Sequence, residues 1–201
     1  MKDNGTLLKQ GLLPVIITIL LTVLFVLLEF GFFIFISFIV LIGMFYVFKN
    51  PDIEINKDEN AVLAPVDGKI TAIDTIDDEK LIFCKVSLAD THVVRSPIES
   101  SMKIIGHRFG LNLNPNSYKG YLLNEFVEFE FDYIKLKLLS GICNVSIDYS
   151  ENPQVAQGER ISVFVDGIAV IRIKKDVNLN VSIGDKILAG QTKIATINQE
   201  G

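Results

Sequence analysis

Two short segments carry the side chains best suited to acid–base chemistry. The first, Ala64-Pro65-Val66-Asp67-Gly68-Lys69, contains the carboxylate of Asp67; the second, Asp90-Thr91-His92-Val93-Val94-Arg95-Ser96-Pro97, contains the imidazole of His92. Histidine changes its charge nearest to neutral pH, so His92 is the candidate for moving a proton. Asp67 is followed by Gly68, and Asp-Gly is also a common hairpin turn, so this aspartate has a structural explanation as well. Asp90 is suited either to closing a turn or to orienting a nearby histidine. Residue types alone therefore leave a structural and a catalytic interpretation open.

The remaining reactive side chains are few. Cys84 and Cys143 both lie in apolar, strand-like runs, and we expect them to be buried reduced thiols. His107, between Gly106 and Gly110, is expected in a surface loop. Neither histidine is spaced with a cysteine as a metal site requires, so no metal is expected.

An apolar run precedes these segments. From Gly11 to Phe48 the only ionisable side chain is Glu29, and the mean hydropathy of the chain is +0.39. The run exceeds the length of about 20 residues that one bilayer span needs. We therefore predict two membrane spans, 12–28 and 30–48, that turn at Glu29 as an antiparallel hairpin. A single tilted or re-entrant segment and a cleaved signal peptide are the alternatives, and no cleavage site follows the run.

Basic residues flank the run at both ends. Lys2 and Lys9 precede it, Lys49 and Lys57 follow it, and the turn has neither lysine nor arginine. The positive-inside rule then places both ends of the hairpin in the cytoplasm. The expected location is the inner or cell membrane, with the soluble domain facing the cytoplasm.

The rest of the chain has the alternation typical of β-strands. A polar linker is predicted over 50–62 and a β domain over 63–201, after the hairpin of 1–49. No segment has the pattern of a long amphipathic helix. We therefore predict a mainly β fold, a barrel or a barrel-like sandwich. The expected strands are 69–73, 81–87, 101–105, 126–134, 135–139, 143–148, 161–164, 169–173, 181–183 and 193–197.

The order of these features resembles one enzyme family. The chain resembles the short membrane-anchored form of phosphatidylserine decarboxylase. After the hairpin, Phe48-Lys49-Asn50-Pro51 is similar to that family's F-F-R-D-P motif. The segments of Asp67 and His92 then resemble its S-P-A-D-G-K and D-V-H-V-N-R-A-P motifs, in the same order. Gly158-Glu159-Arg160-Ile161 resembles the family's G-E-R-F, and Val181–Gln191 its closing V-K-V-G-D-x-V-x-A-G-E. The resemblance extends over nearly the whole chain.

The resemblance implies a particular chemistry. The family cuts its own chain before a serine, and that serine becomes a pyruvoyl group that serves as the electron sink for decarboxylation of phosphatidylserine. By motif match, Asp67 belongs to the self-cleavage apparatus and His92 handles protons during decarboxylation. Arg95 stands where some members have a second histidine.

One position departs from the family. The family's G-E-R-F-G-M-I-R-F-G-S-R aligns its Gly-Ser with Gly167 and Ile168. Isoleucine has no nucleophilic atom, so no pyruvoyl group is expected and no other cofactor is implied. Ser162 is the nearest serine and is the alternative processing site. In the drifted segment 112–125, Tyr118, Tyr121, Leu122 and Leu123 are candidates for contact with lipid.

Three hypotheses follow from the sequence. The first is a membrane-anchored pseudoenzyme of phosphatidylethanolamine biosynthesis that binds lipid and assists an intact paralogue. The second is an active decarboxylase with an atypical processing site, which the presence of Asp67 and His92 favours. The third is a non-catalytic interaction module with a β-barrel fold on a membrane tether. The expected partner is a membrane phospholipid such as phosphatidylserine, with a homo-oligomer also open, and no nucleic acid is expected.

Overall fold

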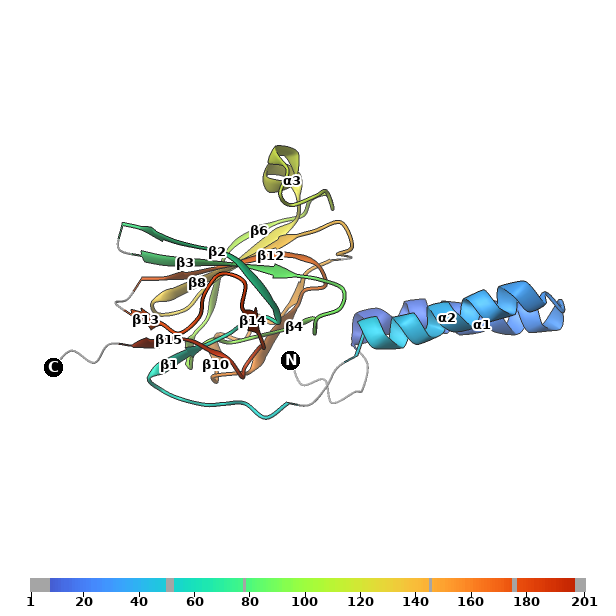
Figure 1. Cartoon of the computed structure of the whole chain (residues 1–201), viewed down its shortest axis with the longest axis horizontal. Coiled ribbons are helices and arrows are strands. Elements are labelled where there is room, and N and C mark those ends of the chain that lie inside the picture. Colours follow the sequence, from blue (N-terminus) through green and yellow to red (C-terminus); the bar gives the residue numbers. More distant parts are fainter. Residues whose placement is uncertain (1–7, 50–52, 78, 145, 175–176, 198–201) are drawn as a thin grey trace. The chain divides into compact units, whose positions relative to one another are not determined.

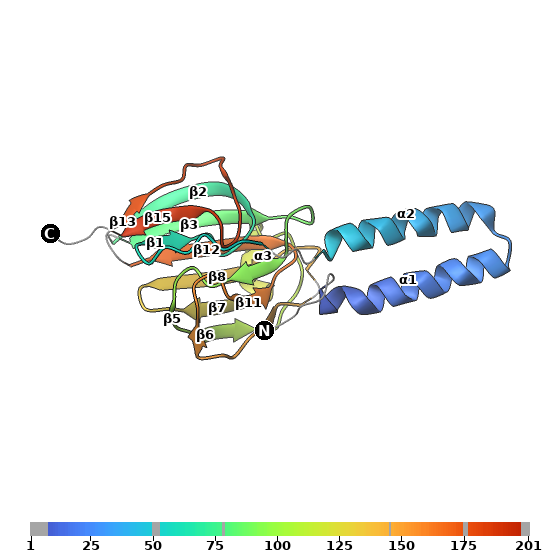
Figure 2. The ribbon, with the colours of Figure 1, turned by 90° about the horizontal axis from the view of Figure 1, so that it is seen from below.

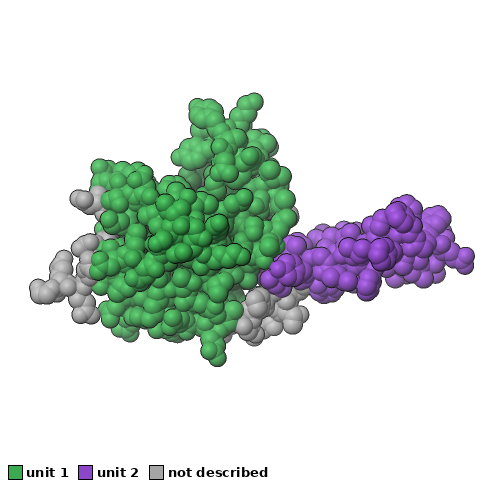
Figure 3. Space-filling view, in the orientation of Figure 1, with its two compact units in different colours: residues 1, 53–201 green, residues 2–52 purple. Residues whose placement is uncertain are grey.

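The computed structural model describes residues 8–49, 53–77, 79–144, 146–174 and 177–197. The chain forms two compact units, which Figure 3 distinguishes by colour: residues 2–52 make one, and residues 1 and 53–201 make the other. The hypothesised motif residues Asn50 and Pro51 lie outside the described part of the chain.

The first unit is a pair of antiparallel helices, α1 (Lys9–Leu27) and α2 (Gly31–Val47), as Figure 2 shows. The turn between them has Glu29 in a left-handed conformation, with φ of 60°. At the open end, the amide of Leu8 donates a 2.9 Å hydrogen bond to the carbonyl of Phe48. Between the helices, the hydroxyl of Thr18 lies 3.2 Å from the sulfur of Met44. The prediction of two helices that turn at Glu29 is confirmed.

The prediction that these helices span a membrane is not supported. No helix in the described ranges is both long enough and apolar enough to be a candidate span. The helices have 19 and 17 residues, because the turn at 28–30 divides the 38-residue apolar run into two short pieces. Leu13, Leu20, Phe32 and Phe35 are among the many large apolar side chains that these helices expose.

The second unit is mainly β-sheet (Figure 1). Its largest sheet has seven antiparallel strands in the order β14-β2-β3-β12-β8-β7-β6. Its strands are β2 (Gly68–Ile76), β3 (Glu79–Val86), β6 (Lys103–Arg108), β7 (Phe126–Glu130), β8 (Ile134–Ser140), β12 (Gly167–Ile173) and β14 (Lys186–Ile187). The six-residue helix α3 (Tyr118–Leu123) lies between β6 and β7 in the chain.

Strand β12 lies at the centre of this sheet. All seven of its residues, from Gly167 to Ile173, pair with β3 on one side and with β8 on the other. Its odd-numbered residues, Ala169 among them, are buried in the core, and its even-numbered residues, beginning with Ile168, face outward. The position at which the family would cut its chain is therefore a regular part of the central strand.

Three small sheets complete the domain, in the orders β1-β15-β13, β4-β11-β9 and β10-β5. They consist of β1 (Ala61–Leu63), β4 (Val93–Arg95), β5 (Ser100–Ser101), β9 (Asp148–Tyr149), β10 (Gln154–Val155), β11 (Arg160–Val163), β13 (Val177–Leu179) and β15 (Lys193–Ile197). The mainly β prediction is confirmed, but the described strands form no closed barrel. β14 and β6 are open edges of the large sheet, and the other strands pair in separate groups.

Some local predictions differ from the structure. In the expected linker, the amide of Asn56 donates to the carbonyl of Gly190 at 3.0 Å, and Asp58 forms a 2.7 Å ion pair with Lys193. Residues 181–183 are not a strand, because Asp185 accepts the amide of Ser182 and closes a turn there. The expected strand over 143–148 is largely irregular in its described residues, for the carboxylate of Asp166 binds the amide of Cys143.

Candidate functional site

Asp67 connects three segments of the β domain. It stands just before β2, and its Oδ1 accepts a 2.6 Å hydrogen bond from the amide of Ala189, after β14. Its Oδ2 accepts a longer one, 3.3 Å, from the amide of Thr91. The Asp-Gly dipeptide is not the turn of a hairpin, because β1 pairs with β15 and not with β2. Gly68 is needed for another reason: an added Cβ would lie 2.7 Å from the sulfur of Cys84.

His92 is buried in the loop that leads into β4, with 1% of its surface exposed. Its carbonyl accepts a 2.8 Å hydrogen bond from the amide of Phe164, after β11. Asp90 closes the turn before it, accepting hydrogen bonds from the amide and the hydroxyl of Ser87 at 2.9 and 2.8 Å. In the Asp-x-His pattern, Asp90 therefore forms a turn and His92 is a buried residue. Because Thr91 binds Asp67, the two predicted site residues belong to one cluster.

Gly167 joins this cluster through Phe164. It has a φ of 145°, and an added Cβ would clash with the carbonyl oxygen of Leu139 and lie 2.7 Å from Cζ of Phe164. The amide of Phe164 is the one that binds the carbonyl of His92. Asp67, His92 and Gly167 are thus connected, through Thr91 and Phe164, at one end of the large sheet. No other residue fits the backbone of Gly167 without strain.

Ile168 faces the outer side of the sheet, where it pairs with Lys85 and Leu139. It lines a surface pocket of about 300 Å³, together with Lys85, Asp166, Asn114 and Asn116 among others. Neither Asp67 nor His92 is among the described residues that line this pocket. The side chain of Ile168 is a hydrocarbon, so no hydroxyl is available at this position for attack on the carbonyl of Gly167.

Ser162, the alternative processing site, is fully buried in β11. Its hydroxyl donates a 2.7 Å hydrogen bond to the carbonyl of Asp148. The preceding carbonyl, that of Ile161, accepts the amide of Ser150 at 2.8 Å. Both groups that a cleavage reaction would need are therefore engaged in the pairing of neighbouring segments.

Three neighbours of the cluster have roles that the sequence did not indicate. Cys84 is buried, and burial, followed by the charges of Asp90 and Asp67, raises its pKa to about 12. Arg95 donates from Nη1 to the carbonyl of Gly158 at 2.9 Å. Cys143 is exposed, which corrects the expectation that both thiols are buried. The sulfur of Cys84 lies against Gly68, the residue after Asp67, so this thiol is beside the cluster.

A second cluster of polar side chains was missed by sequence reasoning. His107 lies in β6 and not in a surface loop, and its Nδ1 is 3.1 Å from the hydroxyl of Tyr149. Its Nε2 lies 4.0 Å from Oε1 of the buried Glu125. The three residues come from segments far apart in the sequence, so spacing carried no signal for them.

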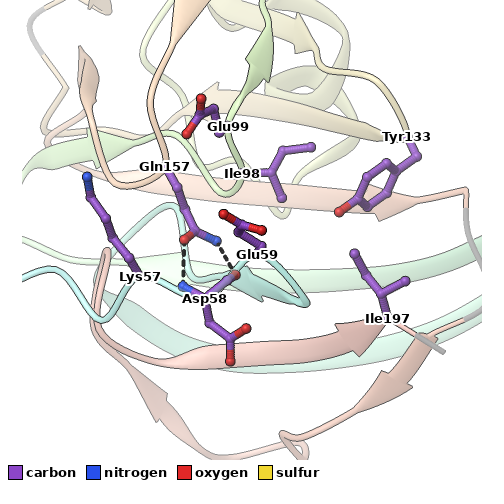
Figure 4. Close-up of a pocket in the computed structure, with 8 residues that line it drawn as sticks. All are labelled: Lys57, Asp58, Glu59, Ile98, Glu99, Tyr133, Gln157 and Ile197. Carbon is purple, nitrogen blue, oxygen red and sulfur yellow. Dashed lines mark hydrogen bonds between the residues drawn. The ribbon is translucent and has the colours of Figure 1, made fainter. Parts of the chain in front are cut away.

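A larger pocket than the one at Ile168 lies elsewhere in the β domain. It has a volume of about 580 Å³ and is lined by Asp58, Glu59, Glu99, Tyr133 and Gln157 among others, as Figure 4 shows. The carbonyl of Tyr133 accepts the amide of Lys174, just beyond the end of β12 that is opposite to Gly167. This pocket therefore does not include the predicted site residues. Among the described residues, no group of three histidine, cysteine or acidic side chains is placed to hold a metal ion.

Comparison with known proteins agrees with the order of the motifs. The family described as phosphatidylserine decarboxylase matches residues 41–195. A protein of Methanosarcina mazei, provisionally named archaetidylserine decarboxylase proenzyme, is 31% identical over 78% of this chain and 76% of its own length. The phosphatidylserine decarboxylase proenzymes of Wolbachia pipientis and Pelagibacter ubique are both 28% identical, over 77% and 80% of this chain and 76% and 82% of their own.

No solved structure matches the chain. The sequence matches nevertheless extend over most of the β domain, including the segments of Asp67, His92 and Gly167. The chain therefore belongs to the phosphatidylserine decarboxylase family.

Proposed function

We propose that this protein is a phospholipid-binding member of its family that does not process itself and has no pyruvoyl group. The observation that carries the proposal is Ile168 on the outer face of β12, beside Gly167. The pyruvoyl group arises from a serine, and the hydrocarbon at this position does not fit that chemistry. No step of a decarboxylation is therefore assigned to this chain.

The surroundings of Ser162 argue against a shifted processing site. Its hydroxyl is a donor to Asp148, and the carbonyl it would attack is an acceptor within the sheet. Cleavage there would require both hydrogen bonds to break at a fully buried residue, at an unfavourable free energy of about 1–3 kcal/mol for each buried group.

The presence of Asp67 has a structural explanation. Its carboxylate binds two backbone amides from distant segments. Asp67, which favours an active enzyme on sequence grounds, is therefore equally expected where the fold needs such an acceptor. The bond between His92 and Phe164 uses only the backbone of His92, so it does not explain a histidine at this position. The pseudoenzyme proposal therefore accounts for Asp67 without catalysis.

The membrane is the proposed place of action. The helical hairpin exposes large apolar side chains, among them Leu13, Leu27 and Phe32, and from Gly11 to Phe48 its only ionisable side chain is Glu29. A surface of this kind is unfavourable in water and is typical of contact with lipid. We propose that the hairpin attaches the protein to the inner or cell membrane, with the β domain on the cytoplasmic side, where it binds phosphatidylserine or a related anionic phospholipid.

The decisive experiment restores the missing nucleophile. Intact-mass measurement of the purified full chain should show one species of 22.4 kDa. Ile168→Ser should produce two pieces, 1–167 and 168–201, with a blocked amino terminus on the second. Ile168→Ala is the matched control, because it removes the same bulk without supplying a hydroxyl, and it should stay intact.

A second variant tests the role of Asp67 in that restored reaction. Asp67→Asn in the Ile168→Ser chain should slow cleavage strongly if the self-cleavage apparatus is still in place. Cleavage of the unaltered chain at Gly167 or Ser162 would overturn the proposal and favour an active enzyme. Equal binding of the full chain to vesicles with and without phosphatidylserine would favour the interaction-module hypothesis instead.

A further inference from the structure

An apolar patch surrounds α3 on the outside of the β domain. Its six members, defined here as the α3 patch, are Phe109, Leu111, Tyr118, Tyr121, Leu122 and Leu123. Phe109 and Tyr118 are 81% and 79% exposed, which is far more than an apolar side chain that packs on its own domain. Contiguous exposed apolar side chains of this kind mark a surface that contacts something else.

The backbone beneath the patch is fixed by a buried asparagine. Nδ2 of Asn124 donates to the carbonyls of Leu113 and Ser140, both at 2.7 Å, and its Oδ1 accepts the amide of Leu113 at 2.9 Å. Arg108 donates to the carbonyl of Asn124 at 2.7 Å and to that of Tyr121 at 3.3 Å. Because the segment is held by these bonds and not by its apolar side chains, the side chains are free to bind a partner without reordering the loop.

The charge of the segment indicates what that partner is. Residues 109–124, which include all six members of the patch, contain Lys119 and no aspartate or glutamate, although the chain as a whole has a net charge of −5. Lys137, from β8, lies 5.5 Å from the ring centre of Tyr121. Acidic groups on neighbouring segments are Glu128, which pairs with Lys137, the buried Glu125, and Asp166, which lines the pocket at Ile168. Tyrosine is enriched at membrane–water interfaces, and lysine is attracted to anionic headgroups. A surface that combines tyrosine, leucine and lysine is therefore typical of contact with an anionic membrane.

The patch also adjoins the pocket at Ile168. Asn114 and Asn116, in the loop that leads into α3, line that pocket together with Lys85 and Ile168. A surface that rests on a bilayer at α3 would therefore bring the pocket near the headgroups. In that position, the headgroup of a phospholipid could enter the pocket while its acyl chains stay in the membrane.

We propose that the α3 patch is a second lipid-contacting surface, separate from the helical hairpin, which seats the β domain on an anionic bilayer. The choice of lipid over a protein partner rests on the proposed function, since the family's name implies a phospholipid substrate. The tyrosines lie at the headgroup level, the leucines and Phe109 enter the acyl region, and Lys119 and Lys137 face the anionic headgroups.

The chain has no tryptophan, so a single one reports on its own surroundings. In the full-length protein, Tyr118→Trp is to be compared with Ile76→Trp, at the β2–β3 turn, where the side chain is 49% exposed and lies at the opposite end of the sheet. The probe is a vesicle of phosphatidylcholine and phosphatidylserine that carries bromine-labelled acyl chains. Emission of Tyr118→Trp should shift to shorter wavelength and be quenched, and emission of Ile76→Trp should not change.

A charge variant tests the electrostatic part. Lys119→Gln, added to Tyr118→Trp, should raise the lipid concentration for half of the emission change about fivefold, because one cation at an anionic surface contributes about that factor. The effect should be lost on vesicles of phosphatidylcholine alone and should weaken in high salt.

Two results would overturn the proposal. One is an unchanged tryptophan emission of Tyr118→Trp when vesicle flotation shows that the protein is bound to the vesicles. The other is a shift that appears without lipid and grows with protein concentration, which would assign the patch to a second copy of the chain. Neither readout depends on whether the chain cleaves itself, so the mass measurement at Ile168 tests the proposed function separately.

Discussion

The carboxylate of Asp67 and the amide of Ala189 are joined by a 2.6 Å hydrogen bond between residues that are 122 positions apart. With the bond to Thr91, this contact holds together the start of β2, the loop before β4 and the segment after β14. A residue that the family's motif associates with cleavage therefore also ties the domain together. The structural role of Asp67 can be tested separately from a role in cleavage, because the stability of the folded protein can be measured in a chain that does not cleave itself.

Asp67→Ala should lower the free energy of unfolding by about 2–3 kcal/mol, because two backbone amides lose a charged acceptor. Asp67→Asn retains an acceptor oxygen and should lose about half as much. Urea unfolding followed by circular dichroism measures both. Asp74→Ala, at an exposed site in β2, is the control and should change stability by less than about 0.5 kcal/mol. Equal stability of the Asp67 and Asp74 variants would contradict the structural role.

Gly167 and Gly184 form a matched pair for testing the backbone at the position where the family's motif has its cleaved Gly-Ser. Both have positive φ, 145° and 98°, but an added Cβ would clash with Leu139 and Phe164 at Gly167 and would meet nothing within 4 Å at Gly184. Gly184→Ala should lower stability by about 1 kcal/mol from conformation alone. Gly167→Ala should lower it by at least about 3 kcal/mol, since overpacking adds to the strain. A smaller loss at Gly167 than at Gly184 in thermal unfolding would show that the central strand relaxes easily.

The two cysteines should differ in reactivity. At pH 8 a thiol reagent should modify the exposed Cys143 in the folded protein, and should reach Cys84 only after unfolding. Cys143→Ser should abolish the fast phase, and Cys84→Ala should leave it unchanged. Fast labelling of both thiols would contradict the burial of Cys84.

Cys84 should also make stability depend on pH. Its pKa in the folded protein is about 12, above the value of 9.0 for a free thiol, so the unfolded chain releases this proton at lower pH than the folded chain does. Its contribution is full below about pH 9 and falls between pH 9 and 12, by up to about 1.4 kcal/mol for each pH unit. Denaturant titrations of the unaltered chain should show this loss, and those of Cys84→Ala should lack it. Parallel pH profiles of the two would contradict the assignment.

Asn124 should control the order of the α3 segment. Asn124→Ala leaves Leu113 and Ser140 without their buried partners, so stability should fall by about 2–4 kcal/mol and amide exchange over 111–123 should speed up. Asn116→Ala, on the exposed side of the same loop, is the control. Exchange that rises equally in both variants would show that Asn124 is not what fixes the segment.

The sequence predicted the parts of the fold that follow from local pattern. The alternation in 69–73, 81–87 and 169–173 predicts strands where β2, β3 and β12 lie, because burial on one face imposes a period of two. In β2 a bulge between Ile70 and Ala72 interrupts that period. The turn at Glu29 follows from its being the only ionisable side chain in the run. The arrangement of separate sheets was not predictable in this way, because pairing such as that of β4 with β11 joins strands far apart in the chain.

The same division holds for the site. Motif order predicts Asp67, His92 and Gly167 as site residues, and that assignment stays a prediction. The links through Thr91 and Phe164 were not predictable, because they arise only when the chain is folded. The helix α3 was missed, since six residues with Gly120 among them have too little periodicity to detect. Its one local signal is Ser117, whose hydroxyl accepts the amide of Gly120 as a helix N-cap.

The pairing of β1 with β15 has a consequence for how the protein is made. Ala61, in the first strand of the domain, pairs with Thr196, in its last strand. During synthesis the helical hairpin emerges before the β domain, and the small sheet of β1, β15 and β13 stays incomplete until residues 193–197 have left the ribosome. A domain closed by such distant contacts is expected to fold slowly, and late. Nascent chains that stall before residue 193 should therefore remain open to protease in the β domain while the hairpin is already formed.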